Sequence, residues 1–151
     1  MSSENVINQE NEVKRLEQSL IVLNHAFRKH RDFIKEKFKI SALEMELIQF
    51  VVQNGSQKMK SVSEHFDIKL STLTSIIDKA ENQRILKRTN SKEDRRVVFL
   101  DCTRKGKSIY EDYGKFLHET ALRMQNNLNH DRFAHFVESM ETFTKISVPS
   151  N

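Results

Sequence analysis

The chain has 151 residues, 25 of them basic and 21 acidic, with only 3 Gly, 1 Pro and 1 Cys. This length allows a single domain with a hydrophobic core, and so little Gly and Pro excludes a loop-rich or β-rich protein. A single cysteine excludes a disulfide within the chain, which suits a reducing cytoplasm. The polar N-terminus does not resemble a signal peptide, and no segment approaches the ~18 consecutive apolar residues of a membrane span. We therefore expect a mainly α-helical cytoplasmic protein with no membrane partner.

A long amphipathic helix is predicted over residues 10–38, because apolar side chains recur there at helical spacing and neither Pro nor Gly interrupts them. These side chains are Val13, Leu16, Leu20, Leu23, Phe27, Ile34 and Phe38. A second helix is predicted over residues 42–53, with Ser41 as its N-cap and Asn54-Gly55 as its stop. The first eight residues of the chain and the last five are expected to fray.

Two short helices follow, separated by a tight turn. The first is expected to run through Phe66 and to break at Asp67, and the second is expected to begin near Lys69. Helical spacing places Leu70, Leu73, Ile76, Ile77 and Ala80 on the core face of the second helix, and Thr72, Ser75 and Lys79 on the opposite face. Small hydroxyl groups and a lysine can enter the major groove of DNA without steric hindrance, so this helix is predicted to read bases.

A basic β-hairpin is predicted after these helices. Residues 85–88 and 97–102 are expected to form its strands and residues 89–95 its polar turn, with Lys92, Arg95 and Arg96 near the tip. An arginine on a projecting hairpin suits a narrow minor groove, where the negative potential is enhanced. Alternatively, Asp94 pairs with one of the arginines and only orders the turn. We expect both, with one arginine tethered by Asp94 and the other, Arg95, free to reach DNA.

The positive charge of the chain is concentrated in this region. Residues 58–107 hold 13 basic and 7 acidic residues, whereas the rest of the chain holds 12 basic and 14 acidic residues. A charged run is usually only a solvated face. Because this run coincides with a helix-turn-helix pattern, contact with phosphates is the better explanation.

The C-terminal part of the chain is predicted to form two more helices. Thr103 is expected to cap a helix that reaches about residue 128, and Asn129 or Asp131 is expected to begin the last one. Their apolar stripes consist of Ile109, Tyr113, Phe116, Leu117, Thr120, Met124 and Leu128, and of Phe133, Phe136, Val137, Met140 and Phe143. Helices this apolar on so small a chain suggest a face shared with a second copy.

These motifs together resemble the multiple-antibiotic-resistance regulator (MarR) family of winged helix-turn-helix transcription factors. The matching residues are Ser71-Thr72-Leu73-Thr74, Ile77-Asp78-Lys79, Glu93-Asp94-Arg95-Arg96 and Thr103-x-x-Gly106, with Cys102 in the place of a leucine. The resemblance implies a winged helix-turn-helix at residues 41–102, and long helices at residues 10–38 and 103–146 that entwine two subunits. It also implies a homodimeric, sequence-specific transcriptional regulator, expected to be a repressor, whose partner is a pseudo-palindromic operator in double-stranded DNA. A small-molecule effector, bound between the dimer helices and the reading module, is expected to alter its affinity for DNA.

The chain departs from the family pattern at four positions. Asp67 and Arg84 stand where the family often has Gly, Lys69 where it often has an N-cap Ser, and Ser75 where it often has Arg. Asp tolerates the left-handed conformation that the turn needs, and Ser71 is expected to act as the N-cap one turn later. The residues expected to bind DNA are Lys69, Ser71, Thr72, Thr74, Ser75, Lys79, Lys92, Arg95 and Arg96.

Other chemistry has little support in the sequence. A Gly-rich phosphate loop, H-E-x-x-H and G-x-S-x-G are all absent, so no catalytic residue and no cofactor are expected. The pairs His25/His30 and His130/His135 are five residues apart and do not share one helix face, so a metal site within one helix is not expected. Cys102 is expected to be a small buried hydrophobe, with an intermolecular redox role as the alternative. The alternative function is a helical interaction protein with a degenerate winged helix that binds protein or nucleic acid without sequence preference.

Overall fold

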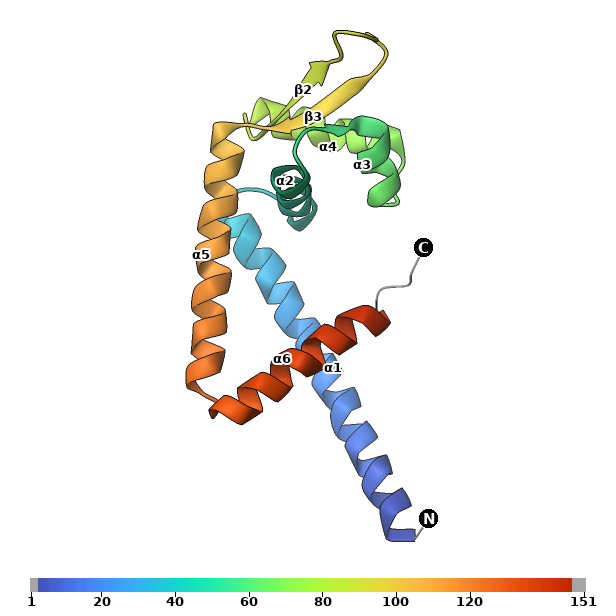
Figure 1. Cartoon of the computed structure of the whole chain (residues 1–151), viewed down its shortest axis with the longest axis vertical. Coiled ribbons are helices and arrows are strands. Elements are labelled where there is room, and N and C mark those ends of the chain that lie inside the picture. The colour runs from blue at the N-terminus through green and yellow to red at the C-terminus, as the bar shows by residue number, and fades with distance from the viewer. Residues whose placement is uncertain (1–2, 148–151) are drawn as a thin grey trace. The chain divides into compact units, whose positions relative to one another are not determined.

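The computed structural model describes residues 3–147, with side chains for residues 9–145. The chain divides into two compact units, Met1–Lys107 and Ser108–Asn151. The helices are α1 (Ser3–Phe38), α2 (Ala42–Asn54), α3 (Met59–His65), α4 (Leu70–Asn82), α5 (Arg104–Asn126) and α6 (His130–Ser147), and the strands are β1 (Gln57–Lys58), β2 (Leu86–Asn90) and β3 (Val98–Cys102). The predicted mainly helical winged helix-turn-helix is confirmed (Figure 1). The expected fraying is wrong for residues 3–8 and for Ser147, which are helical. The other residues expected to fray, 1–2 and 148–151, lie outside the described residues.

The winged part is built on a three-stranded antiparallel sheet of order β1-β3-β2. Leu100 in the central strand lies opposite Gln57 in β1 and opposite Arg88 in β2. Strand β3 lies within the predicted range, whereas β2 lies further along the chain than expected, because Thr89 and Asn90 continue the pairing with β3. The turn between the two strands therefore spans residues 91–97. The buried apolar core of the first unit consists of Ile34, Ile40, Met45, Leu47, Ile48, Val51, Met59, Val62, Leu73, Ile77, Ala80, Ile85, Leu86 and Leu100.

Local sequence signals determine where α2 begins and where α2 and α3 end. The Ser41 hydroxyl accepts the Glu44 amide at 3.2 Å, and the Glu44 carboxylate accepts the Ser41 amide at 2.6 Å, so the predicted cap is a complete capping box. Gly55 follows α2 with φ of 73°, a conformation that glycine allows at little cost. Asp67 follows α3 with φ of 48°, which confirms that an aspartate can take the place of glycine in this turn.

The start of α4 differs from the prediction in two respects. Its N-cap is Lys69, which makes no side-chain cap hydrogen bond, and Ser71 already lies inside the helix. The Ser71 cap is therefore wrong, since an N-cap needs a non-helical backbone to turn its oxygen toward the first amides. Leu70 is 48% exposed instead of buried, because the part of α4 that packs on the core begins at Leu73.

Helix α4 ends in a Schellman motif. The Ile85 amide donates to the Ala80 carbonyl at 2.9 Å, and the Arg84 amide donates to the Glu81 carbonyl at 2.8 Å. This arrangement requires a left-handed residue, and Arg84 takes a φ of 59°. The family's frequent Gly at this position thus has a physical basis, and the arginine in this chain carries backbone strain.

We expect Arg84→Gly to stabilise the fold by about 0.5–1 kcal/mol. Glycine relieves roughly 1–2 kcal/mol of left-handed strain and loses about 0.5–1 kcal/mol to the greater entropy of the unfolded chain. Urea unfolding followed by circular dichroism measures the change. Gln83→Gly is the matched control, because Gln83 has a right-handed helical backbone and its replacement is expected to destabilise. An Arg84→Gly variant as unstable as this control would contradict the assignment of strain to Arg84.

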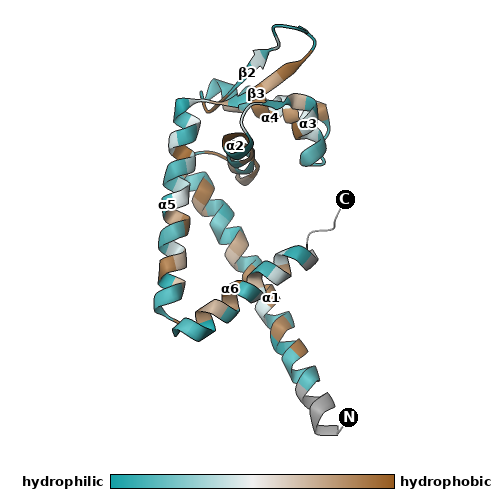
Figure 2. Ribbon diagram, in the orientation of Figure 1, coloured by the Kyte–Doolittle hydropathy of each residue, from teal (hydrophilic) through white to brown (hydrophobic). Residues whose placement is uncertain are grey.

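In the second unit, Asn129 begins α6, because its side-chain oxygen accepts the Arg132 amide at 2.9 Å. Apolar residues recur along both α1 and α6 (Figure 2). Many large apolar side chains of α1, α5 and α6 are exposed: Val13, Leu16, Leu20, Ile21, Val22, Leu23 and Phe27 in α1, Leu117, Leu122 and Met124 in α5, and Phe136, Val137, Met140 and Phe143 in α6. None of the described helices is long and apolar enough to cross a membrane.

Candidate nucleic-acid interface

The residues expected to read DNA form the exposed side of α4. Lys69, Ser71, Thr72, Thr74, Ser75 and Lys79 are all exposed, whereas Leu73, Ile77 and Ala80 on the opposite side are buried. The buried side fixes the rotation of the helix about its axis. The exposed side is therefore small and polar in a defined orientation, as a helix in a major groove requires.

The hydroxyl groups on this side differ in what they offer a ligand. Thr74 and Ser75 donate to the carbonyl oxygens of Leu70 and Ser71, at 2.8 Å and 3.2 Å, so their protons are used within the helix. Their oxygens still accept hydrogen bonds, which suits the amino groups of adenine and cytosine in the major groove. Thr72 makes no hydrogen bond with any described residue, so its hydroxyl can donate or accept.

Lys79 lies on the same side of α4 and is held by a buried carboxylate. Its Nζ is 3.2 Å from Oε2 of Glu44, whose side chain is only 2% exposed. Burial raises the pKa of Glu44, but the hydrogen bonds from Ser41 and Lys79 and the charge of Lys79 outweigh this effect, and the pKa lies below its usual value. The carboxylate is therefore ionised at neutral pH. Lys79, with three donors and an exposed ammonium, keeps donors for another partner.

An open groove of about 340 Å³ connects these residues to the start of α2. It is lined by Ser41, Glu44, Thr72, Ser75, Ile76 and Lys79. Glu44 is a part of this surface that sequence analysis does not single out, although the Ser41-x-x-Glu44 spacing is a recognisable capping-box signal. Its pairing with Lys79, 35 residues away in the chain, has no such signal.

The basic residues of the hairpin, Lys92, Arg95 and Arg96, are all exposed in the turn between β2 and β3. The predicted tether between Asp94 and an arginine side chain is wrong. Oδ1 of Asp94 accepts the backbone amide of Arg96 at 2.9 Å, and among the described residues no salt bridge joins Asp94 to Arg95 or Arg96. Asp94 orders the turn through the backbone, because an aspartate side chain commonly accepts the amide of the residue two positions later. Both guanidinium groups are thus available to a ligand.

Arg88 joins the hairpin to α4, and sequence analysis does not identify it. Its Nη1 lies 2.5 Å from Oδ1 of Asp78 and 3.0 Å from Oε2 of Glu81, and its Nη2 donates to the Thr74 carbonyl at 2.8 Å. The Arg88 amide also donates to Oε1 of Glu81 at 2.6 Å. Asp78 belongs to the motif that resembles the MarR family, and these contacts give it a structural role. The network fixes the hairpin relative to the exposed side of α4.

We expect Arg88→Met to destabilise the fold by about 1–2 kcal/mol. Methionine keeps most of the apolar stem, while the loss of the guanidinium leaves Asp78 and Glu81 without their cation. The expected loss of stability is smaller than for a buried ion pair, because the Asp78 side chain is 56% exposed. Urea unfolding measures the change, with Lys87→Met on the same strand as the control expected to stay within about 0.5 kcal/mol of wild type. Equal stability of the two variants would contradict the role of Arg88.

The Thr103-x-x-Gly106 motif holds the start of α5 against the end of α4. The Thr103 hydroxyl lies within hydrogen-bonding distance of the Arg84 and Ile85 carbonyls, at 2.7 Å and 2.8 Å, and accepts the Gly106 amide at 3.1 Å. Cys102 is half-buried beside them, and burial raises the pKa of its thiol to about 11. The thiol is therefore protonated at neutral pH, which favours the packing role of Cys102 over redox chemistry.

The described residues contain no group of three or more His, Cys, Asp or Glu side chains that could hold a metal ion. The surface formed by α4 and the hairpin instead combines hydroxyl groups, an ammonium and guanidinium groups on a rigid winged helix-turn-helix. Together the fold and this surface define a winged-helix transcriptional regulator.

The comparisons with known proteins agree and identify the family. The family model described as transcriptional regulator SarA/Rot matches residues 29–113, and the chain belongs to this family. It is similar to the HTH-type transcriptional regulator MhqR of Bacillus subtilis, with 27% identity over 95 residues, 61% of this chain and 66% of that protein. These relatives are transcriptional regulators and not enzymes.

Solved structures confirm the resemblance to the MarR family at the level of the fold. A MarR family protein from Bacillus stearothermophilus matches with a TM-score of 0.78 and 17% identity, over 91% of this chain and 96% of that one. FabT of Streptococcus pneumoniae, solved in complex with DNA, matches with a TM-score of 0.77 and 22% identity, over 89% of this chain and 96% of that one.

Proposed function

We propose that this regulator is a homodimer that binds a pseudo-palindromic operator in double-stranded DNA and represses transcription. The observation that carries the proposal is the polar, exposed side of α4, at Thr72, Ser75 and Lys79, next to a hairpin with two unpaired arginines, Arg95 and Arg96. The hydroxyl groups read base edges, and the hairpin reaches the adjacent minor groove and phosphates. A fold neighbour solved with DNA supports this assignment.

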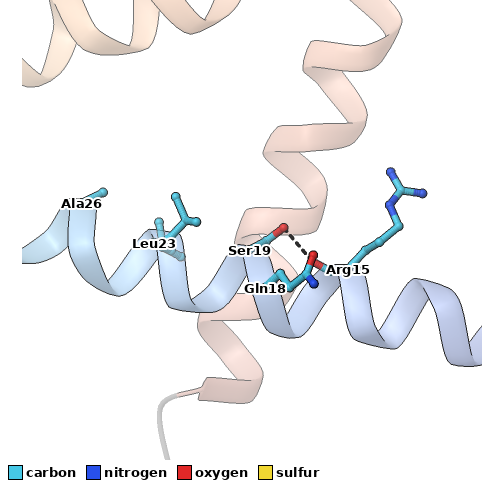
Figure 3. Close-up of a pocket in the computed structure, with 6 residues that line it drawn as sticks. Arg15, Gln18, Ser19, Leu23 and Ala26 are labelled. Atoms are coloured by element: carbon cyan, nitrogen blue, oxygen red, sulfur yellow. Dashed lines mark hydrogen bonds between the residues drawn. The ribbon is translucent and has the colours of Figure 1, made fainter.

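The exposed apolar face of α1 supports the homodimer. A shallow hollow of about 450 Å³ on α1 alone is lined by three polar and three apolar residues at helical spacing: Arg15, Gln18, Ser19, Val22, Leu23 and Ala26 (Figure 3). Several apolar side chains of this helix are about half exposed in the single chain, including Leu16 at 59% and Phe27 at 55%. A second copy covers such a face in a symmetric dimer.

A dimer sets the spacing of the DNA contacts. Two α4 helices related by a two-fold axis read half-sites about one helical turn, ~34–36 Å, apart along the duplex. A protein that covers a promoter in this way excludes the polymerase, which is the physical basis of the proposed repression. A small molecule that changes the spacing of the two α4 helices lowers the affinity, and this is the proposed mode of effector action.

Footprinting on the DNA that flanks the protein's own gene tests the proposal, with and without candidate phenolic ligands. We expect a protected region with two-fold symmetry, and sedimentation at micromolar concentration should show a dimer. A stable monomer, or uniform protection with no preferred region, would contradict it. Uniform protection would favour the alternative, an interaction protein that binds nucleic acid without sequence preference.

A further inference from the structure

A second hollow, lined by three lysines, lies beside the groove of α4. It has a volume of about 230 Å³ and is lined by Lys35, Lys39, Ile40, Ser41 and Lys79. The groove next to Thr72 and Ser75 also includes Ser41 and Lys79, so the two hollows meet at these residues. The surface proposed to read bases therefore continues past the start of α2 to the end of α1.

We propose that this basic hollow, formed by Lys35, Lys39 and Lys79, binds a phosphate of the DNA backbone outside the base-reading contact. The inference rests on the proposed function. Lys35 and Lys39 lie outside the basic segment 58–107, so the charge distribution along the sequence does not identify them as part of the DNA-binding surface.

The charges in the hollow favour an anion. Three lysines and no acidic residue line the basic hollow. The carboxylate of Glu44, which lines the adjoining groove, is buried and accepts Lys79 and the Ser41 amide through Oε2. Lys35 and Lys39 are exposed and have no salt bridge to any described residue. Two lysines without a salt bridge, next to Lys79 with its exposed ammonium, adjoin a polar groove, and this arrangement fits the backbone of a polyanion.

Glu44 and the backbone hold this arrangement in place. Glu44 restrains Lys79 at the junction of the two hollows, at 3.2 Å. Lys39 takes a φ of 59°, and its amide donates to the Lys35 carbonyl at 3.1 Å, so the chain turns at the end of α1 with both lysines on one hollow.

The test protein is a double variant that carries both Lys35→Gln and Lys39→Gln. Both side chains are exposed, so their replacement leaves no buried charge unpaired. The control is Lys37→Gln, which removes one positive charge from the same turn of α1 but does not line the hollow. Fluorescence anisotropy with a 30-base-pair duplex, repeated over a range of salt, measures both affinity and salt dependence. Removing one phosphate contact flattens the slope of log affinity against log salt by about 0.9.

We expect the double variant to bind about tenfold or more weakly than the control and to flatten the slope by about two units, one phosphate in each subunit. Duplexes with a single uncharged methylphosphonate give a sharper readout. At the phosphate seated in the hollow, methylphosphonate weakens binding by wild type and causes no further weakening in the double variant. A double variant within twofold of the control would overturn the inference, as would additive weakening at every phosphate position.

Two more measurements distinguish a DNA phosphate from a free anion, and the inference from the proposed function. Inorganic phosphate is titrated without DNA while the amide resonances of residues 39–44 are followed by NMR. Saturation only at millimolar phosphate supports a backbone phosphate as the occupant, and saturation at micromolar phosphate would overturn it in favour of a free anion. If wild type binds no duplex, the proposed function fails together with the inference. If the Thr72→Ala, Ser75→Ala double variant has a reduced sequence preference while the lysine double variant equals its control, only the inference fails.

Discussion

Replacing Arg95 and Arg96 together by alanine is expected to weaken binding to any duplex by roughly three orders of magnitude. In the proposed dimer the two side chains of each subunit would make four charge contacts with DNA in all, at about 1 kcal/mol each. The slope of log affinity against log salt should flatten by between three and four units, at about 0.9 for each contact. Each single alanine variant should show about half of this change, because neither guanidinium is tied to Asp94. Anisotropy titrations at several salt concentrations measure both quantities.

Two controls separate charge from the geometry of the turn. Lys115→Ala removes a positive charge from α5, where Lys115 pairs with Asp112 and is not part of the proposed DNA-binding surface. This variant should leave the slope of log affinity against log salt unchanged. Asp94→Asn keeps an oxygen that accepts the Arg96 amide but removes the negative charge, so its affinity should equal or exceed that of wild type. Slopes equal to wild type for both arginine variants would show that the hairpin does not touch DNA.

Gly106→Ala is expected to destabilise the fold by about 2–3 kcal/mol. A Cβ at this position would lie 2.4 Å from the Ile85 carbonyl oxygen and 2.6 Å from Sγ of Cys102. The oxygen belongs to the backbone at the end of α4, so it cannot move aside without disturbing the Schellman motif and the start of the hairpin. Urea unfolding of the variant and of wild type measures the difference in the free energy of unfolding.

Gly114→Ala is a matched control for this substitution. Gly114 lies in the same helix, and a Cβ there meets no atom within 4 Å. Alanine is a better helix former than glycine, so Gly114→Ala should stabilise the protein by about 0.5–1 kcal/mol. Opposite signs for the two variants support the close approach at Gly106, whereas two stabilising variants would contradict it.

Signals that act over a few residues are sufficient to predict much of this fold. The capping box at Ser41, the stop at Gly55 and the turn at Asp67 each depend on the local backbone, and the structure has all three. The buried side of α4 follows from helical spacing because Leu73 and Ile77 face one core. These signals locate the winged helix-turn-helix and the exposed side of α4 in the sequence.

Contacts that depend on register or on competing partners could not be predicted in this way. Arg88 meets Asp78 and Glu81 only because β2 lies against α4 in one particular register. The two-residue strand β1 is too short to show a periodic pattern. Asp94 had two available partners, and it accepts the nearby backbone amide of Arg96 instead of a mobile guanidinium.

Base reading by α4 is the central claim, and the ratio of affinities for two duplexes tests it most directly. One duplex is selected from random sequences by the wild-type protein, and the other has the same length and an unrelated sequence. Thr72→Ala with Ser75→Ala should reduce the preference by roughly 1 kcal/mol for each hydroxyl, while the salt slope and the free energy of unfolding stay unchanged, because both side chains are exposed. A double variant that keeps the full wild-type preference would contradict base reading by this side of α4.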